Sequence, residues 1–270
     1  EGAMQGLAPM VGYEGTISFL GDTDLFDYHD FIYPEGTESC FFSAVLDYLE
    51  SKDWHTVNLK SIPEISPTLS WLPELARARG YSVDVVHEDV TPGVALPNDW
   101  EEYLGALSKK DRHELRRKMR RLGAAEDYKV RLVSSKSPHL DIEMDWFFHL
   151  LRASREDKDN FLTESRETFF RSLATGMNDS FRLLFMELNG ERVAGVIYFD
   201  YSGSRLLYNS GLDLRFNQLS VGLLLKALSI KGAIEEGLVY FDFLRGPEPY
   251  KYDLGGQDLS VYSMLIKREM

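Results

Sequence analysis

The sequence predicts a mixed α/β fold in which the chain builds two α/β units, each with a mixed and mostly antiparallel sheet flanked by helices. Apolar residues make up 44% of the chain and aromatic residues 13%, enough for a sizeable core. Segments with strand periodicity alternate with segments of helical periodicity along both halves. Two long strands meet at Asn189-Gly190, the strongest short hairpin pattern in the chain. No exact repeat relates the halves, which we expect to meet near a basic helix.

Composition and charge exclude several classes of protein. The chain has 270 residues, enough for one large domain or two of ordinary size, and its single cysteine, Cys40, rules out an internal disulfide framework. A net charge of −13 excludes nucleic-acid binding through bulk charge. The sequence has neither an apolar run of ~20 residues nor a signal peptide. These features predict a cytoplasmic protein without a transmembrane segment.

The first half is expected to alternate strands and helices. The segment from Gly6 to Val11 has the pattern of a strand whose partners lie upstream, as in a fragment that lacks an N-terminal piece; the alternative is a tag remnant before a start at Met4. Further strands are expected at residues 16–20, 56–59 and 81–87, and helices at residues 38–52 and 68–79. Cys40 is expected in the core. No metal site is expected, because no second histidine stands at ligand spacing from His29.

A helix with a strongly basic face is expected between Ser108 and Gly123. Ser108 and Asp111 form a capping-box pattern at its start. Eight Lys or Arg residues and two acids lie from Lys109 to Arg121. Such a face could bind phosphate, nucleic acid or an anionic membrane surface. The alternative is a solvated face that offsets an acidic protein, and no aromatic residues are interleaved for base stacking.

The second half is expected to continue with helices at residues 138–155, 164–175 and 220–236, the first two joined by a charged link. Its strands are expected at residues 129–133, 181–188, 192–201, 205–211, 238–243 and 259–267. The turn from strand 205–211 into helix 220–236 presents free amides and a positive helix end, which can hold a phosphate. The following strand ends in a loop, residues 244–251, with charged and aromatic side chains and two prolines.

Several segments are similar to the GNAT superfamily of acyltransferases, in the branch of CelD-like cellulose-biosynthesis proteins, which is related to the FemAB-type transferases. They are the basic residues 107–122, the link Arg155-x-x-Lys158-x-x-Phe161-Leu162, the helix start at Ser220, and residues 241–251 (FDFLRGPEPYK). Asp27-Tyr28 and Ile62-Pro63 also fit this branch. The resemblance covers most of the chain.

The resemblance implies two GNAT-like units: a degenerate one at residues 1–124, which ends in the basic helix, and an intact one at residues 125–270. The pyrophosphate of acetyl-CoA or another acyl-CoA would rest on the helix start, and the pantetheine arm between strands 205–211 and 238–243. The residues implied in cofactor binding are Asn209, Ser210, Gln218, Leu219, Ser220, Val221 and Gly222. The family has a glycine-rich turn at this helix start, whereas this sequence keeps only Gly222 there, with Ser220 near it.

Acyl transfer to an amine needs an aligned donor, a base for the amine proton and a hydrogen-bond donor for the oxyanion. Backbone amides from Tyr208 to Ser210 are candidates for the oxyanion site, and Tyr250 is a candidate to protonate the leaving thiolate. Asp242 and Glu248 are candidates for the base or for holding the amine. The catalytic set expected from the sequence is therefore Asp242, Tyr250 and Tyr208.

Four charged residues are expected to bind substrate. They are Lys158, Arg245, Glu248 and Lys251. Three of the site residues also have a structural interpretation: Asp242 pairing with Arg245, Tyr208 packing in the sheet, and Lys158 lying on a solvated link.

These residues predict an N-acyltransferase that moves an acyl group from acyl-CoA to a primary amine of an acceptor such as a sugar or cell-envelope precursor. A second interpretation is a FemAB-like transferase that uses aminoacyl-tRNA and a cell-wall precursor. A third is a non-catalytic module that binds an anion or polymer through the stretch from Lys109 to Arg121.

Overall fold

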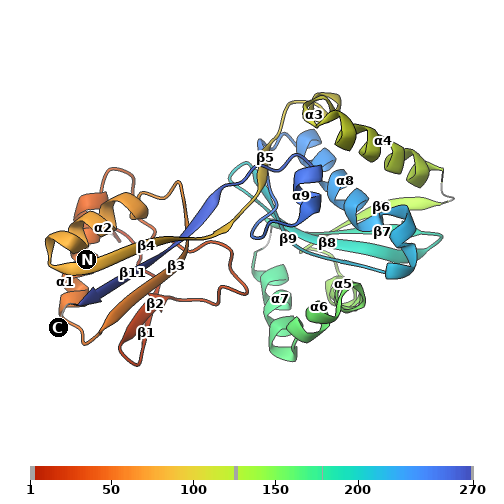
Figure 1. Cartoon of the computed structure of the whole chain (residues 1–270). Helices are drawn as coiled ribbons and strands as arrows, with labels where there is room; N and C mark the ends of the chain where they lie inside the picture. The colour runs from red at the N-terminus through yellow and green to blue at the C-terminus, as the bar shows by residue number, and fades with distance from the viewer. Residues whose placement is uncertain (1–3, 125–126, 178, 269–270) are drawn as a thin grey trace. The chain divides into compact units, whose positions relative to one another are not determined.

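The computed structural model describes residues 4–124, 127–177 and 179–268, which form two compact units (Figure 1). The first unit comprises the chain up to Thr91 and again from Asp258, and the second comprises Pro92–Gln257. These units differ from the expected ranges 1–124 and 125–270. The basic helix packs in the second unit, and the last strand joins the sheet of the first. Sequence periodicity shows that a segment is a strand, but not which distant strand it pairs with.

The first unit contains a five-stranded sheet in the order β1-β2-β3-β11-β4. The strands are β1 (Met10–Tyr13), β2 (Thr16–Phe19), β3 (Thr56–Pro63), β4 (Tyr81–Val90) and β11 (Ser260–Arg268). β11 pairs antiparallel with both β3 and β4, whereas β2 pairs parallel with β3.

The strand expected from Gly6 to Val11 with upstream partners is found instead at Met10–Tyr13, paired with the downstream strand β2. Glu14 and Gly15 join the two strands with positive φ angles of 47° and 74°. Such a two-residue turn matches the twist of an antiparallel hairpin. The sequence pattern missed it because glutamate seldom occupies a left-handed position.

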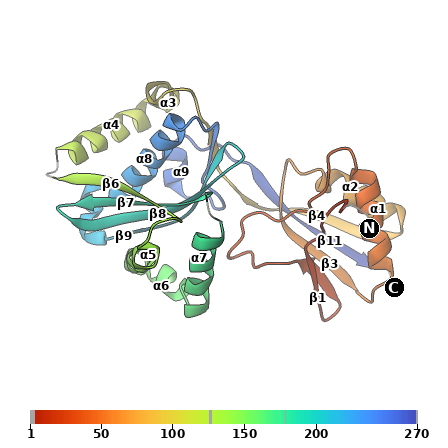
Figure 2. The same ribbon diagram turned by 180° about the vertical axis from the view of Figure 1, so that it is seen from behind.

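Two helices lie on one face of this sheet, α1 (Glu38–Glu50) and α2 (Thr68–Ala78) (Figure 2). α1 buries Phe42, Val45, Leu46 and Leu49. Cys40 is exposed, so the prediction that it lies in the core is wrong. The buried face of α1 begins at Phe42 and does not include Cys40.

The second unit contains a six-stranded sheet in the order β5-β10-β9-β8-β7-β6. The strands are β5 (Gly93–Ala95), β6 (Tyr128–Ser134), β7 (Phe181–Leu188), β8 (Glu191–Tyr201), β9 (Ser204–Leu212) and β10 (Tyr240–Asp242). All neighbours are antiparallel except β9 and β10. Asn189 and Gly190 have positive φ angles of 50° and 82°, so the predicted β7–β8 hairpin is confirmed.

Helices cover both faces of the second sheet (Figures 1 and 2). On one side lie α3 (Trp100–Ala106), α4 (Lys109–Gly123), the 3-10 helix η1 (Leu214–Leu219), α8 (Val221–Glu235) and α9 (Pro249–Asp253). On the other lie α5 (Leu140–Ser154), α6 (Glu156–Phe161) and α7 (Glu164–Gly176). The sheet has a hydrophobic core on each face, and alternate residues of β7 point into one or the other. Leu184 and Met186 pack with α8, and Leu183 and Phe185 pack with α5.

Two helices were not foreseen from the sequence. α6 occupies the charged link at residues 154–162, and α9 lies within the loop that follows β10. Both are too short for apolar periodicity to distinguish them from turns. None of the helices in the described ranges is both long enough and apolar enough to cross a membrane.

β9 passes very close to α5 at Gly211. A Cβ atom placed there would lie 2.4 Å from the Leu151 nitrogen and 2.5 Å from the Leu150 carbonyl carbon. Because the clash is with backbone, we expect Gly211→Ala to lower the free energy of unfolding by about 1–3 kcal/mol, measured by urea denaturation. Gly105→Ala is the control, since a Cβ at Gly105 meets nothing within 4 Å. Equal effects of the two substitutions would contradict this packing.

Candidate functional site

The second sheet opens between β9 and β10. Their parallel pairing begins at Ser204 with Tyr240 and ends at Leu206 with Asp242. β10 stops there, whereas β9 continues to Leu212. The second half of β9 therefore has an edge that does not pair with β10. The sequence resemblance places the pantetheine arm in this gap between the two strands.

Side chains engage the backbone of β9 at this open edge. The Ser210 amide donates to Asn209 Oδ1 at 2.9 Å. Lys158 Nζ, from α6, donates to the Ser210 carbonyl and to Asn209 Oδ1, the latter at 3.3 Å. Burial, assisted by the positive charge of Arg155, lowers the pKa of Lys158 to about 8. Lys158 therefore reaches the β9 edge instead of lying on a solvated link, while the Ser210 amide expected for the oxyanion is held by Asn209.

The N-terminus of α8 forms one wall of a pocket of about 290 Å³. Ser220 is the N-cap, in a left-handed conformation with φ 56° and without a capping bond from its side chain. The Leu224 amide donates to the Ser220 carbonyl at 3.0 Å, so the three preceding amides have no acceptor within the helix. The pocket is lined by Lys118, Leu212, Asn217, Ser220, Gly222, Leu223, Lys226, Tyr250 and Asp253.

Of the five residues expected to hold a pyrophosphate, two line this pocket, Ser220 and Gly222. Val221 is fully buried in the core, and the Gln218 carbonyl accepts a hydrogen bond from Arg121 at 2.7 Å. Leu219 packs against the same core. The groups of this pocket that carry positive charge or unbonded donors are therefore the first backbone amides of α8 and the side chains of Lys118 and Lys226.

Lys226 is the residue that sequence reasoning missed. Its side chain is 6% exposed, and its Nζ lies 4.5 Å from the centre of the Tyr250 ring and 3.5 Å from the Gly222 carbonyl. Burial lowers its pKa to about 7, with further contributions from the charges of Lys158 and Lys251. The sequence did contain an indication of this site, a single lysine among the apolar residues of the helix. Buried lysines are rare unless they are paired, so such a lysine is a candidate functional residue.

Tyr250, on α9, forms the opposite wall. Burial, with a contribution from the negative charge of Glu248, raises the pKa of its hydroxyl. The phenol therefore remains protonated at neutral pH and can donate a hydrogen bond or a proton. Tyr250 therefore lies beside the pocket, and its role as a proton donor stays a prediction.

Lys251 closes the loop that follows β10. Its Nζ donates to the carbonyls of Leu244, Arg245 and Gly246 at 2.8, 2.6 and 2.9 Å and pairs with Glu248 Oε2 at 2.9 Å. These contacts use the whole hydrogen-bonding capacity of the ammonium, which favours a positioning role over substrate binding.

Asp242 and Tyr208 are also held by structural contacts. Asp242 Oδ1 accepts the Leu244 amide at 2.7 Å and so supports the same loop. The ring of Tyr208 packs against Phe170 and Phe199, with centroids 5.6 and 5.5 Å away, in the core beneath α5 and α7. Tyr250 packs against the α8 core on the other side of the sheet. The structure therefore does not bring the Tyr208 ring to the Lys226–Tyr250 pocket.

The basic helix α4 adjoins the pocket. Ser108 caps it by accepting the Asp111 amide at 3.2 Å, which confirms the predicted helix start. Lys118 lines the pocket, and Arg121 contacts the Gln218 carbonyl just before α8. The positive face of α4 thus continues into the N-terminus of α8.

Comparison with known proteins gives a family and a fold. An acetyltransferase (GNAT) domain family matches residues 109–252. Similar solved structures include FemX, with 11% identity, a TM-score of 0.66, and coverage of 97% of this chain and 85% of that chain. Another is L-PGS from Bacillus licheniformis, with 11% identity, a TM-score of 0.64, and coverage of 96% and 79%.

A third is the C-terminal domain (DUF2156) of a proposed lysylphosphatidylglycerol synthetase from Agrobacterium fabrum, with 10% identity, a TM-score of 0.63, and coverage of 95% and 79%. A comparison with curated proteins gives no match. At these identities the solved structures show the fold alone, and they confirm the expected mixed α/β architecture of two units. The family match covers more than half of the chain, and the chain belongs to the acetyltransferase (GNAT) domain family, in its CelD-like branch.

Proposed function

We propose that the second unit is an N-acyltransferase that moves an acyl group from acyl-CoA, such as acetyl-CoA, to a primary amine of its acceptor. The buried ammonium of Lys226 is the observation that supports this proposal most strongly. Among the described residues, no carboxylate forms an ion pair with it. Its pKa of about 7 leaves Lys226 partly protonated at neutral pH, and a bound anion would favour the ammonium form. The free amides at the start of α8 face the same pocket, and together these groups suit a CoA phosphate.

The chain's own residues supply three roles in this reaction. Lys226 and the first amides of α8 hold a phosphate, and Lys158 fixes the β9 edge along which the pantetheine arm would lie. Acyl-CoA would supply a thioester, whose carbon–sulfur bond breaks as the amine nitrogen bonds to the acyl carbon. Tyr250 donates a proton to the leaving sulfur.

Glu248 is the carboxylate we assign to hold the amine and accept its proton. Its negative charge contributes to the pKa values of Lys158, Lys226 and Tyr250, and its Oε2 atom pairs with Lys251 at 2.9 Å. Asp242 instead supports the loop that carries Glu248. Arg245 lies in the same loop and is proposed to bind an anionic part of the acceptor.

Thermal unfolding with and without CoA tests donor binding. Ligand at 100 times its Kd stabilises the folded state by about 2.7 kcal/mol. Tyr250→Phe keeps the aromatic ring beside Lys226, so we expect it to retain the CoA shift and to lose transfer about 100-fold or more, measured by thiol release with a panel of amines. Absence of a CoA shift in the parent protein would overturn the proposed donor.

A second candidate is a FemAB-like transferase that uses aminoacyl-tRNA. The observation that favours it is the continuity of the α4 cations with the α8 pocket through Lys118 and Arg121. In that case tRNA, and not CoA, would stabilise the protein, in a strongly salt-dependent manner, and a cell-wall precursor would be the acceptor. Polyanion binding that survives Tyr250→Phe, with no transfer to any acceptor, would indicate a non-catalytic anion-binding module.

A further inference from the structure

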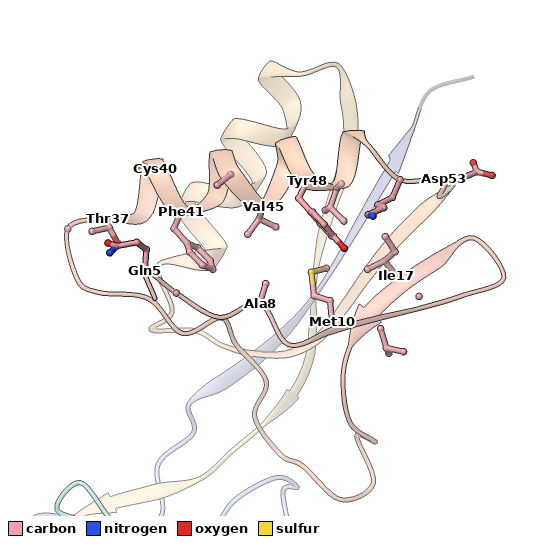
Figure 3. Close-up of a pocket in the computed structure, with 17 residues that line it drawn as sticks. Gln5, Ala8, Met10, Ile17, Thr37, Cys40, Phe41, Val45, Tyr48 and Asp53 are labelled. Carbon is pink, nitrogen blue, oxygen red and sulfur yellow. The ribbon is translucent and has the colours of Figure 1, made fainter. Parts of the chain in front are cut away.

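We propose that the first unit binds a long-chain fatty acid in a pocket beneath α1, with the carboxylate of the ligand at Lys52. The pocket has a volume of about 980 Å³, at the upper end of the range for small-molecule sites. Figure 3 shows Phe41, Val45 and Tyr48 descending from α1, and Ala8, Met10 and Ile17 facing them from the strand side. The inference is independent of the site in the second unit.

Small residues line parts of both walls, and at one of them, Gly6, the ring of Phe41 packs so closely that a Cβ atom would lie 2.5 Å from it. Gly6, Ala8 and Gly12 line the pocket on the strand side, and Ala44 lines it on α1. Between them stand the larger apolar side chains of the walls. The pocket is open to solvent along Cys40, Ala44 and Tyr48, and its apolar lining favours an apolar occupant.

The pocket is elongated along the helix. Its lining extends from Thr37, immediately before α1, to Lys52, just after its end. At 1.5 Å per residue, the 13 residues of α1 span about 20 Å. A linear chain fits such a length better than a compact ring system of the same volume.

Lys52 and Asp53 line one end of the pocket. Lys52 Nζ lies 4.7 Å from the centre of the Tyr48 ring, which is itself part of the wall. No ion pair joins Lys52 to a carboxylate within the described parts of the chain. The neighbouring Asp53 side chain points away from the pocket in Figure 3. An acyl chain that ends in a carboxylate matches both the apolar length and the Lys52 ammonium.

Cys40 provides a direct probe of occupancy. It is the only cysteine, it is exposed, and it lines the pocket. We expect palmitate to slow the alkylation of Cys40 in a saturable manner. Shortening the fatty acid by two methylene groups is expected to weaken protection roughly tenfold, because each buried methylene adds to the affinity. Protection that is absent, or that is equal for octanoate and palmitate, would overturn the proposal.

Two pairs of variants locate the ligand. Ala44→Phe places a ring in the pocket at an exposed helix position and is expected to weaken palmitate binding at least tenfold. Ser39→Phe adds the same ring to an exposed site on α1 outside the pocket and is the control. Lys52→Gln is expected to weaken palmitate binding about three- to tenfold while leaving hexadecanol binding unchanged, and Lys267→Gln is its control.

The results separate this site from the transferase site. Lys226→Met, in the second unit, is expected to leave palmitate protection of Cys40 unchanged. Retention of full palmitate affinity by Ala44→Phe, with circular dichroism showing that the variant is folded, would place the ligand elsewhere. Equal losses for palmitate and hexadecanol on Lys52→Gln would overturn the assignment of the carboxylate to Lys52.

Discussion

Lys226→Met is expected to bind CoA about 10- to 100-fold more weakly than the parent protein. The substitution keeps the length of the side chain but removes a charge-assisted contact of about 1.5–3 kcal/mol. Isothermal titration calorimetry measures the change. Lys231→Met is the control, because Lys231 lies on the same helix but is 40% exposed and paired with Glu235 at 3.6 Å.

The affinity for CoA should also depend on pH in the parent protein. Lys226 has a pKa of about 7 without ligand, and a bound phosphate raises this pKa by favouring the ammonium. Binding is therefore full below pH 7 and weakens as the pH rises through 7, by up to about tenfold per pH unit. Lys226→Met should lose this dependence. A CoA affinity that is the same from pH 6 to 9 in the parent would contradict the role of Lys226.

The same variant should be more stable than the parent without ligand. Unfolded lysine has a pKa near 10.5, against about 7 in the folded state, so the folded protein binds fewer protons between these values. The penalty of burying the charge is thus complete below pH 7 and is relieved as the pH rises toward 10.5. Removing a buried charge that has no ion-pair partner also removes its desolvation penalty, so we expect Lys226→Met to be more stable than the parent. The advantage of Lys226→Met should therefore be largest at or below pH 7.

Arg205→Met is expected to lower the free energy of unfolding of the second unit by about 3–5 kcal/mol. Arg205 is 1% exposed, forms two hydrogen bonds with Asp200 at 2.8 and 2.9 Å, and pairs with Glu236 at 2.8 Å. It also donates to the Ser229 carbonyl at 2.9 Å and lies 4.0 Å from the Tyr198 ring centre. Without the guanidinium, the Asp200 carboxylate, whose side chain is 15% exposed, loses its counterion.

Urea denaturation followed by tryptophan fluorescence and circular dichroism measures this loss. Arg215→Met is the control: Arg215 also pairs with two carboxylates, but its side chain is 71% exposed, and we expect a change of at most about 1 kcal/mol. Asp200→Asn added to Arg205→Met should recover part of the stability, because it removes the unpaired charge. Similar losses for the two arginine variants would show that the buried network does not stabilise the unit.

Local patterns in the sequence predicted the helices and strands of the second unit well. The strand 205–211, the helix 220–236 and the Asn189-Gly190 hairpin are close to β9, α8 and the observed turn, because each depends on neighbouring residues. The partners of β11 depend on contacts across the whole chain, which periodicity does not record. Short helices such as α6 and α9 have too few turns for their apolar residues to form a recognisable helical pattern.

The sequence analysis named the helix start and Tyr250 as parts of the candidate site. It did not identify the buried lysine of that site. The helix start at Ser220 and the side chain of Tyr250 line one pocket, and their roles in binding and catalysis stay predictions. The cation between them, Lys226, could not be assigned because its burial depends on the packing of α8 against the sheet and α9. Tyr208 and Lys251 were expected to take part in catalysis and substrate binding because of their residue types. In the structure, Tyr208 packs in the core and Lys251 stabilises a loop.

The central position of β11 in the first sheet has a consequence for biosynthesis. β11 lies between β3 and β4, although most of the chain separates it from both. During translation, Pro92–Gln257 emerges as a continuous segment and can fold before β11 has left the ribosome. Until then β3 and β4 each lack a neighbour, and their exposed edges are open to pairing with other chains. We therefore expect the nascent first unit to be more open to mispairing than the second unit, which is continuous in the sequence.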